Sequence, residues 1–281
     1  MFNNPHVKSQ KALTEQVYKY YNNKKNDRNL LQATDGCVFH HFGLGPTEID
    51  LNTASDNDII NEIQRQEHEL TTKLIELLDY NDNPTKTLDI ACGRGGNLVR
   101  IAAEFPNAKL EGINICDYQV AFCEEVMKKK SIDDRVKLTL GNFLEMPFDN
   151  ESFSHAFCCE VTQYTTNLNS LLKEINRVME ERGTLVIFTW CYDENKNQSE
   201  LKEIIEPIND HYASTMHSFQ QYKKSFSESG FNLISEEDVT ERLIPYWELR
   251  EQWSLKSGIE PNFLKGHREG YLLYKLFVLQ K

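Results

Sequence analysis

Residues 87–98 of this chain read Thr87-Leu88-Asp89-Ile90-Ala91-Cys92-Gly93-Arg94-Gly95-Gly96-Asn97-Leu98. A short apolar run leads into a cluster of glycines, and an apolar helical pattern begins directly after it. This order predicts a strand, a tight turn and the N-terminus of a helix. Glycines let a backbone pass close to a ligand, and the free N–H groups at a helix N-terminus can bind it. The dinucleotide fingerprint G-x-G-x-x-G has a wider glycine spacing. We therefore expect this turn to bind a ligand, but it is a poor match to a pyrophosphate-binding loop. The alternative is a glycine turn with a purely structural role.

The remainder of the chain from this turn onward alternates between strand and helix patterns. Such alternation is typical of an α/β protein with a parallel sheet covered by helices on both faces. Strands are expected at residues 87–91, 109–114, 136–140, 153–159, 183–190, 231–235 and 271–279. Helices are expected at about residues 117–130, 168–179 and 246–257.

The N-terminal part has a different character. Residues 9–23 carry apolar side chains at helical spacing, and a second apolar stripe runs through residues 59–78. Between them, residues 35–46 resemble a loop yet contain several aromatic and histidine side chains. We therefore divide the chain into an N-terminal helical and loop cap, residues 1–84, and a core, residues 85–281, with an insertion at about 191–265.

The composition limits the classes of function. The chain has 281 residues, 40% of them hydrophobic, and a net charge of −12. Nucleic-acid binding needs clustered Lys and Arg, whereas the basic run Lys128-Lys129-Lys130 ends an expected helix, where cations suit the dipole. No apolar run approaches the ~18 residues of a membrane span, and residues 1–6 lack a secretory apolar segment. We expect a cytoplasmic protein that binds no nucleic acid and has no membrane span.

The cysteines support the same compartment. There are seven, an odd number, and none shows C-x-x-C spacing, which favours reduced thiols over a disulfide framework. Cys158 and Cys159 are neighbours on an expected strand, so their side chains should point to opposite faces of the sheet.

Three segments that follow successive strands resemble the cofactor loops of class I S-adenosylmethionine-dependent methyltransferases. The first is the Asp-x-x-Cys-Gly-x-Gly turn, the second is Gly112 to Gln119, and the third is Gly141 to Phe148. The resemblance implies that Asn114 and Gln119 bond a ribose or carboxylate, and that Asn142 and Phe143 meet the adenine. An ordinary first-turn polar residue is the alternative for Gln119. The implied cofactor-binding set is Asp89, Ala91, Gly93, Gly95, Asn114, Ile115, Gln119, Asn142 and Phe143.

Glu160 follows the fourth expected strand, at the sheet edge where substrate and methyl donor meet in this superfamily. A carboxylate there is attracted to a sulfonium and can also accept a proton after methyl transfer. The alternative is an exposed acid at the end of a strand.

Segments outside the expected sheet indicate a more specific family within this superfamily. The segments Asp35-Gly36 to Gly45, Ile205 to His217 and Ile244 to Arg250 resemble signatures of geranyl diphosphate 2-C-methyltransferases and related terpenyl diphosphate C-methyltransferases. The chain departs from the family pattern at Cys158-Cys159, where the family has Asn-Asn, at Cys92 and at Phe39. The resemblance implies a Rossmann-like seven-stranded sheet, mostly parallel with an antiparallel last strand, an N-terminal helical cap and lid insertions.

The resemblance also implies a reaction, the C-methylation of a prenyl diphosphate, with C2 of geranyl diphosphate favoured. The methylated carbocation would lose a proton to Glu160, which orienting hydrogen bonds would keep ionised by holding its pKa low. Mg²⁺ is expected with the diphosphate, and without an Asp-rich motif its ligands stay unknown. The implied substrate-binding residues are Asn29, His40, His41, Arg94, Tyr212, His217, Tyr222, Tyr246 and Arg250.

Several alternatives stay open. Methylation of a longer farnesyl diphosphate could trigger cyclisation, or the substrate could be a tocopherol, sterol or amine that needs no diphosphate clamp. An adenosylmethionine-binding regulatory module is the non-enzymatic alternative, which Glu160 beside a histidine-rich loop argues against. We expect the N-terminal segment and residues 205–265 to cover the pocket, because water would quench a carbocation. A homo-oligomer is left open.

Overall fold

A seven-stranded sheet forms the centre of the computed structural model, which describes residues 9–25, 36–80 and 86–281. The strand order is β3-β2-β1-β4-β5-β7-β6. β7 is antiparallel to both of its neighbours, and the other strands run parallel to one another. The strands are β1 Lys86–Ile90, β2 Lys109–Asn114, β3 Val136–Leu140, β4 Phe153–Cys159, β5 Met179–Tyr192, β6 Asn232–Asp238 and β7 Leu272–Gln280. The expected seven-stranded sheet with an antiparallel last strand is confirmed.

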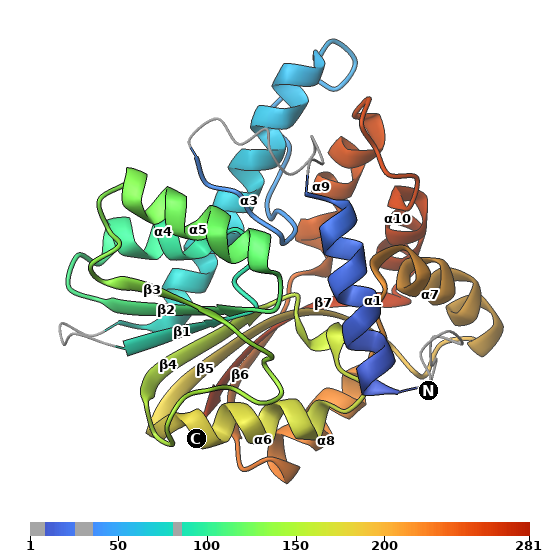
Figure 1. Ribbon diagram of the computed structural model, residues 1–281. Helices are drawn as coiled ribbons and strands as arrows, with labels where there is room; N and C mark the ends of the chain where they lie inside the picture. The colour runs from blue at the N-terminus through green and yellow to red at the C-terminus, as the bar shows by residue number, and fades with distance from the viewer. Residues whose placement is uncertain (1–8, 26–35, 81–85) are drawn as a thin grey trace.

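Helices cover both faces of the sheet (Figure 1). Helices α6 and α8 lie on one face, and α3, α4 and α5 lie on the other. The helices are α1 Gln10–Asn23, α3 Asp56–Leu78, α4 Gly96–Glu104, α5 Asp117–Lys129, the 3₁₀ turn η1 Thr162–Tyr164, α6 Leu168–Val178, α7 Gln198–Tyr212, α8 Phe219–Glu228, α9 Thr240–Gln252 and α10 Glu260–Arg268.

β5 shows how the two faces are filled. Val186, Phe188 and Trp190 belong to the core under α3, whereas Leu185 and Ile187 belong to the core under α6. The side chains alternate because successive residues of a strand point to opposite faces. By the same rule Cys158 packs in one core and Cys159 against the other, as expected, and the cysteines form no disulfide in the described residues.

One helix begins earlier than expected. The sequence predicts a helix at about residues 246–257. α9 instead spans Thr240–Gln252 with Pro245 in its interior. Its buried residues lie on both sides of the proline, from Leu243 to Leu249, so tertiary packing offsets the lost backbone hydrogen bond.

The chain order places a crevice between β1 and β4. From β1 the chain adds β2 and β3 on one side, and it then returns to add β4 and β5 on the other side. Ligands of open α/β sheets bind at the carboxyl ends of the strands where the order reverses. The glycine turn follows β1 and Glu160 follows β4, so both lie at this point.

α1 lies across the carboxyl-end edge of the sheet (Figure 1). Its Leu13 and Val17 pack against Tyr164 of η1 in a small cluster separate from the two main cores. Gln10 ties the start of the helix down, because its side-chain oxygen accepts a 2.7 Å hydrogen bond from the Thr166 amide. Within the described residues, no helix is long and apolar enough to cross a membrane.

Candidate active site

The glycine turn has a backbone that most side chains would not tolerate. Gly93 and Gly95 adopt φ of 56° and 81°, in the left-handed region that favours glycine. A Cβ on Gly95 would lie 2.9 Å from the Sγ of Cys123, and one on Gly93 would lie 2.8 Å from His40 Cδ2. A side chain at either glycine would therefore collide with its neighbours. Glycine lets the turn pack this closely, and the cavity next to the turn stays open to a ligand.

The first cavity lies next to the turn and has a volume of about 480 Å³, its open mouth included. Six of the nine expected cofactor residues line it, namely Ala91, Gly93, Asn114, Ile115, Gln119 and Phe143. Asp89, Gly95 and Asn142 do not line it. Asp89 lies under the turn, where burial raises its pKa well above the usual range, and its Oδ2 has no hydrogen-bond partner among the described residues.

Gln119 leaves a donor for a ligand. Asn114 is buried and uses its side chain within the protein, donating to the Gly93 carbonyl at 3.1 Å and to Gln119 Oε1 at 2.9 Å. This bond fixes Gln119, whose Nε2 is buried without a partner in the described part of the chain. An unpaired buried donor beside a cavity fits a cofactor with hydroxyl and carboxylate oxygens, such as S-adenosylmethionine.

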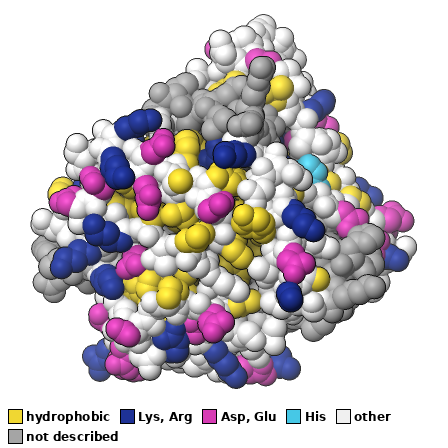
Figure 2. Space-filling view, in the orientation of Figure 1, with side chains coloured by type: hydrophobic (Ala, Val, Ile, Leu, Met, Phe, Trp, Pro, Cys, Tyr) yellow, Lys and Arg dark blue, Asp and Glu magenta, His cyan; other side chains and the backbone are white. Residues whose placement is uncertain are grey.

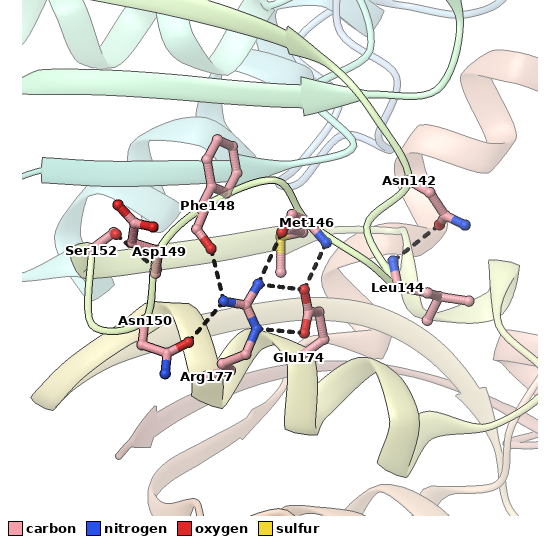
Figure 3. Close-up of polar contacts among 9 residues, drawn as sticks. All are labelled: Asn142, Leu144, Met146, Phe148, Asp149, Asn150, Ser152, Glu174 and Arg177. Carbon is pink, nitrogen blue, oxygen red and sulfur yellow. Dashed lines mark hydrogen bonds and ion pairs between the residues drawn. The ribbon is translucent and has the colours of Figure 1, made fainter.

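The loop after β3 is clamped to α6, as Figure 3 shows. Arg177 donates to the carbonyls of Met146 and Phe148 at 2.9 and 2.7 Å, and Glu174 pairs with it at 2.7 Å. Asn142 Oδ1 accepts the Leu144 amide at 3.0 Å, so its carbonyl oxygen shapes the loop. The sequence analysis missed Arg177 and Glu174, because their partners are backbone atoms that no motif reveals.

A second, larger cavity of about 1110 Å³, its open mouth included, adjoins the first. The two share four lining residues, Tyr21, His40, Glu160 and Tyr164. Eight of the other twenty lining residues are Phe, Trp or Tyr, and the wall is built mainly from α1, the loop before α3, α3 itself, β5, α7, and α9 with the segment that follows it. Figure 2 shows hydrophobic side chains gathered in the middle of this face of the molecule, with charged groups around them.

Glu160 forms part of both cavities and is buried. Its backbone has a φ of 56°, a left-handed conformation that is unusual for a residue other than glycine and is typical of functional sites. Its Oε1 accepts the Phe42 amide and the Tyr274 hydroxyl, each at 2.8 Å. The alternative of an exposed strand-end acid is therefore wrong.

The protonation of Glu160 differs from the expectation. Hydrogen bonds were expected to hold its pKa low, but burial raises the pKa to about 8, and the bonds from Phe42 and Tyr274 offset only part of that rise. Loss of hydration has the largest effect on this pKa, because the carboxyl group is buried at the border of the two cavities.

The two histidines of the loop before α3 have different surroundings. His41 is buried with both ring nitrogens engaged, Nδ1 with the Phe42 carbonyl at 2.8 Å and Nε2 with Asn97 at 3.0 Å. His40 borders both cavities, and its Nε2 has no partner among the described residues. Burial lowers the pKa of His40 to about 3, so the ring is neutral. His41 thus fixes the loop while also lining the larger cavity, and His40 has the ring nitrogen without a partner among the described residues.

Of the other expected substrate residues, Tyr212, Tyr246 and Arg250 line the larger cavity. Arg250 lies over the Trp253 ring at 5.1 Å and 3.7 Å from Glu260. Trp190, a further aromatic candidate for stabilising a cation, lines the same cavity.

The structure does not bring Tyr222, His217 or Arg94 to either cavity. Tyr222 packs in the core under α8, with its hydroxyl 2.7 Å from Thr162, and His217 bonds the Thr165 carbonyl at 2.9 Å. Arg94 is buried beneath the end of α1, where it donates to the Lys25 carbonyl at 3.0 Å. The expectation that the glycine turn reaches the diphosphate through Arg94 is therefore not supported. Asn29 lies outside the described residues.

Six polar residues of the larger cavity were missed by the sequence analysis. They are Lys24, Gln64, Glu67, Gln163, His211 and Ser257. His211 lies directly before Tyr212 inside an implied motif, so that motif was the available signal. The described residues contain no cluster of three metal-ligating side chains.

Comparison with known proteins gives consistent results. A family model described as a methyltransferase domain matches residues 81–251. Geranyl diphosphate 2-C-methyltransferase of Streptomyces coelicolor is 28% identical over 273 residues, covering 95% of this chain and 92% of the relative. Sterol 24-C-methyltransferase erg6 of Schizosaccharomyces pombe is 28% identical but covers 56% of this chain and 42% of its own length.

Solved structures extend the comparison. Geranyl diphosphate C-methyltransferase of S. coelicolor A3(2), in complex with Mg²⁺, geranyl diphosphate and S-adenosyl-L-homocysteine, superimposes with a TM-score of 0.86 at 27% identity, covering 95% of this chain and 97% of that one. A geranyl diphosphate methyltransferase in complex with its substrate and sinefungin gives a TM-score of 0.89 at 26% identity, with 95% and 99% coverage. The likeness therefore includes the cap as well as the methyltransferase sheet.

Proposed function

The chain belongs to the methyltransferase-domain family, and from this we propose that it transfers the methyl group of S-adenosyl-L-methionine to an alkene carbon of a prenyl diphosphate. C2 of geranyl diphosphate is the favoured position, in line with the relatives named geranyl diphosphate 2-C-methyltransferase. The observation that carries the proposal is Glu160, a fixed and buried carboxyl group on the border between the two cavities.

The smaller cavity suits the cofactor. S-adenosyl-L-methionine supplies an electrophilic methyl group on a positively charged sulfur. Gln119 has an unpaired donor for the cofactor's hydroxyl or carboxylate oxygens, and the clamped loop after β3 presents Phe143 for stacking. The close-packed turn at Gly93 forms the floor of this cavity.

The larger cavity offers different chemistry to the two ends of a prenyl diphosphate. Arg250, Lys24 and His211 lie in its wall and can meet an anion. Rings of Phe42, Trp190 and Tyr246 can pack on the hydrocarbon chain, and desolvated rings stabilise a cation by roughly 2 kcal/mol. Basic side chains in the wall favour an anionic substrate over a neutral sterol or tocopherol, which supports a diphosphate substrate.

Glu160 completes the reaction. The alkene gains the methyl group and becomes a tertiary carbocation, and a C–H bond next to the cationic carbon then breaks. Its electrons restore the double bond, and Glu160 takes the proton. Both hydrogen bonds to the carboxyl group end on Oε1, so Oε2 is the oxygen left to accept the proton.

Mg²⁺ fits this proposal as an ion bound to the substrate. The described residues provide no metal-ligating cluster. Mg²⁺ is commonly held by phosphate oxygens and water, with only one or two ligands from the protein. Oxygen atoms of the substrate's diphosphate and water molecules would therefore supply most of its ligands.

The cap is proposed to exclude water. α1 supplies Tyr20 to the larger cavity, Val17 to the smaller one and Tyr21 to both, and Lys24, directly after the helix, adds to the larger cavity. Water would add to a carbocation and end the reaction as an alcohol, so a cover over both cavities protects the intermediate.

The test is incubation with S-adenosyl-L-methionine, Mg²⁺ and a panel of C5, C10, C15 and C20 prenyl diphosphates, with products identified after phosphatase treatment. We expect a methylated C10 product with its double bond restored at C2. A cyclised methylated product from the C15 substrate would favour the farnesyl alternative instead. Absence of methylated product from every diphosphate, with methylation of a sterol or tocopherol, would overturn the proposal.

A further inference from the structure

Tyr274 contacts Glu160, the carboxyl group at the border between the two cavities, from a strand that no motif singled out. It lies on β7 opposite Trp190 of β5 and is fully buried. Its hydroxyl donates to Glu160 Oε1 at 2.8 Å, although the two residues are 114 positions apart. The bond therefore joins the antiparallel part of the sheet to the carboxyl end of β4.

The backbone of Tyr274 is held on both sides. Its amide donates to Thr240 Oγ1 at 2.9 Å, and its carbonyl accepts the Val239 amide at 3.0 Å. The ring lies 6.0 Å from that of Phe42 in the aromatic cluster beside the larger cavity. The hydroxyl is consequently a fixed donor, whereas a surface tyrosine would sample several rotamers.

Two donors meet on one oxygen of Glu160. Phe42 approaches from the loop before α3, Tyr274 approaches from β7, and both bonds end on Oε1. The described residues give no hydrogen bond to Oε2 of Glu160. A carboxylate anchored in this way has one orientation, in which one oxygen is committed to the protein and the other is available.

We propose that Tyr274 is a positioning residue for the proton transfer, which rests on the proposed function: its hydroxyl orients Glu160 with Oε2 available to the substrate and stabilises the carboxylate over the carboxylic acid. Tyr274 takes no proton itself. Burial and the nearby Glu160 raise its own pKa well above the usual range, so it remains a donor at every pH at which an enzyme is assayed.

Titratable groups from several elements surround Glu160, and among them Glu67 works against its ionisation. Burial raises the pKa of Glu160 to about 8, and Glu67 of α3 adds to the rise, whereas the Phe42 and Tyr274 bonds lower it. The other titratable groups around it are Cys159, Tyr21 of α1, His40, Tyr212 and His211 of α7, and Tyr246 and Arg250 of α9, with Lys24 after α1. Loss of the Tyr274 bond therefore shifts the balance further toward the protonated acid.

The variant Tyr274→Phe removes the hydroxyl and keeps the ring. A hydrogen bond to a charged group corresponds to a shift of about one to two pH units. We expect the rise of kcat on the acidic side of the pH profile to shift by about one unit to higher pH. At pH values below this rise, kcat should fall roughly tenfold. KM for both substrates should stay within about twofold. Raising the pH should restore most of the lost activity.

Tyr80→Phe is the matched control. The Tyr80 hydroxyl is likewise hydrogen bonded, 2.7 Å from Thr87 Oγ1, and lies near the start of β1, at the other end of the sheet. It should leave the pH profile unchanged. If Tyr274→Phe unfolds, 3-fluorotyrosine at position 274 serves instead, because it keeps the ring and is a stronger donor, which should move the limb to lower pH.

A readout without turnover separates this inference from the proposed function. The carboxyl carbon of Glu160 can be titrated by NMR in protein labelled with ¹³C-glutamate and assigned with Glu160→Gln. A higher titration midpoint in Tyr274→Phe than in the wild type and Tyr80→Phe supports the inference, even if no prenyl diphosphate is methylated. An unchanged midpoint, or a loss of kcat that is equal at every pH, overturns it, even if methylation is observed.

Discussion

The backbone amide of Phe42 donates a 2.8 Å hydrogen bond to Glu160, across 118 positions of sequence. Phe42 lies in the loop before α3, and Glu160 directly follows β4, so the N-terminal region holds the group proposed to act as the base. His41 fixes the same loop by bonding the Phe42 carbonyl at 2.8 Å. The cap and the sheet are thus joined at the point where the two cavities meet.

Glu160→Gln should abolish turnover and keep the fold. Glutamine retains an oxygen that can accept the Phe42 and Tyr274 bonds, but it cannot take up a proton. General-base catalysis contributes about 10²–10⁴-fold, so we expect kcat to fall by at least about 100-fold while calorimetry shows cofactor binding within about threefold. Glu62→Gln is the control, since Glu62 is also buried and bonded to a backbone amide but lies outside both cavities. Normal turnover by Glu160→Gln would exclude a base role.

The pH profile should reveal a carboxyl group with a raised pKa. A glutamate with an ordinary pKa near 4.5 is ionised throughout the range from pH 6 to 9, so it would cause no change there. The pKa of Glu160 is about 8, so its basic form is lost as the pH falls through 8, and kcat/KM should rise with pH up to that point. The positive charge of the bound cofactor favours the ionised carboxylate and so lowers the pKa of Glu160 in the complex. The rise of kcat with pH should therefore occur at lower pH than the rise of kcat/KM. A flat kcat/KM profile between pH 6 and 9 would contradict this.

Arg177→Ala should weaken cofactor binding without touching the cofactor pocket. The guanidinium holds the loop after β3 through the Met146 and Phe148 carbonyls (Figure 3). Without it the loop that presents Phe143 loses its anchor, and we expect the dissociation constant for S-adenosyl-L-methionine to rise by about 5- to 30-fold, as for a loss of 1–2 kcal/mol. Arg268→Ala, which removes an exposed pair with Glu248, should have no such effect in the same calorimetric titration.

Gly95→Ala should destabilise the turn for two reasons. The left-handed φ of 81° costs a non-glycine residue about 1–2 kcal/mol, and the new Cβ would lie 2.9 Å from Cys123 Sγ. With overpacking included, we expect a loss of about 2–4 kcal/mol in the free energy of unfolding, measured with urea. Gly258→Ala has a similar φ of 90° with no atom within 4 Å, so it should show the conformational cost alone. Adding Cys123→Ala to Gly95→Ala should restore part of the lost free energy of unfolding, because it removes the Sγ atom that the new Cβ meets. If nothing is restored, the contact with Cys123 is not the cause of the destabilisation.

Arg250→Lys should affect the diphosphate end of the substrate. Lysine keeps the charge but loses the planar fork that binds phosphate oxygens in pairs. We expect KM for the prenyl diphosphate to rise about tenfold, with a smaller change in kcat and none in cofactor affinity. The exposed Arg242, which pairs with Glu237, gives the control variant Arg242→Lys. An unchanged KM would remove Arg250 from the proposed diphosphate site.

Local patterns in the sequence were enough to identify the sheet and the glycine turn. Strand and helix periodicities and the glycine spacing depend on neighbouring residues, so they can be read without knowing the fold. The expected position of Glu160 at a strand end follows from the same kind of information. Chain order then fixed the crevice between β1 and β4, because parallel strands bring their carboxyl ends to one edge.

Tertiary structure alone decided which side chains meet at that edge. Phe42 and Tyr274 contact Glu160 from more than 100 positions away, and their contact depends on how the cap and β7 pack. Packing also buried Tyr222 and His217 away from both cavities, although both were expected to bind the substrate and His217 belongs to a matching motif. The raised pKa of Glu160 has the same origin, because desolvation depends on everything that surrounds the carboxyl group and not on its sequence neighbours.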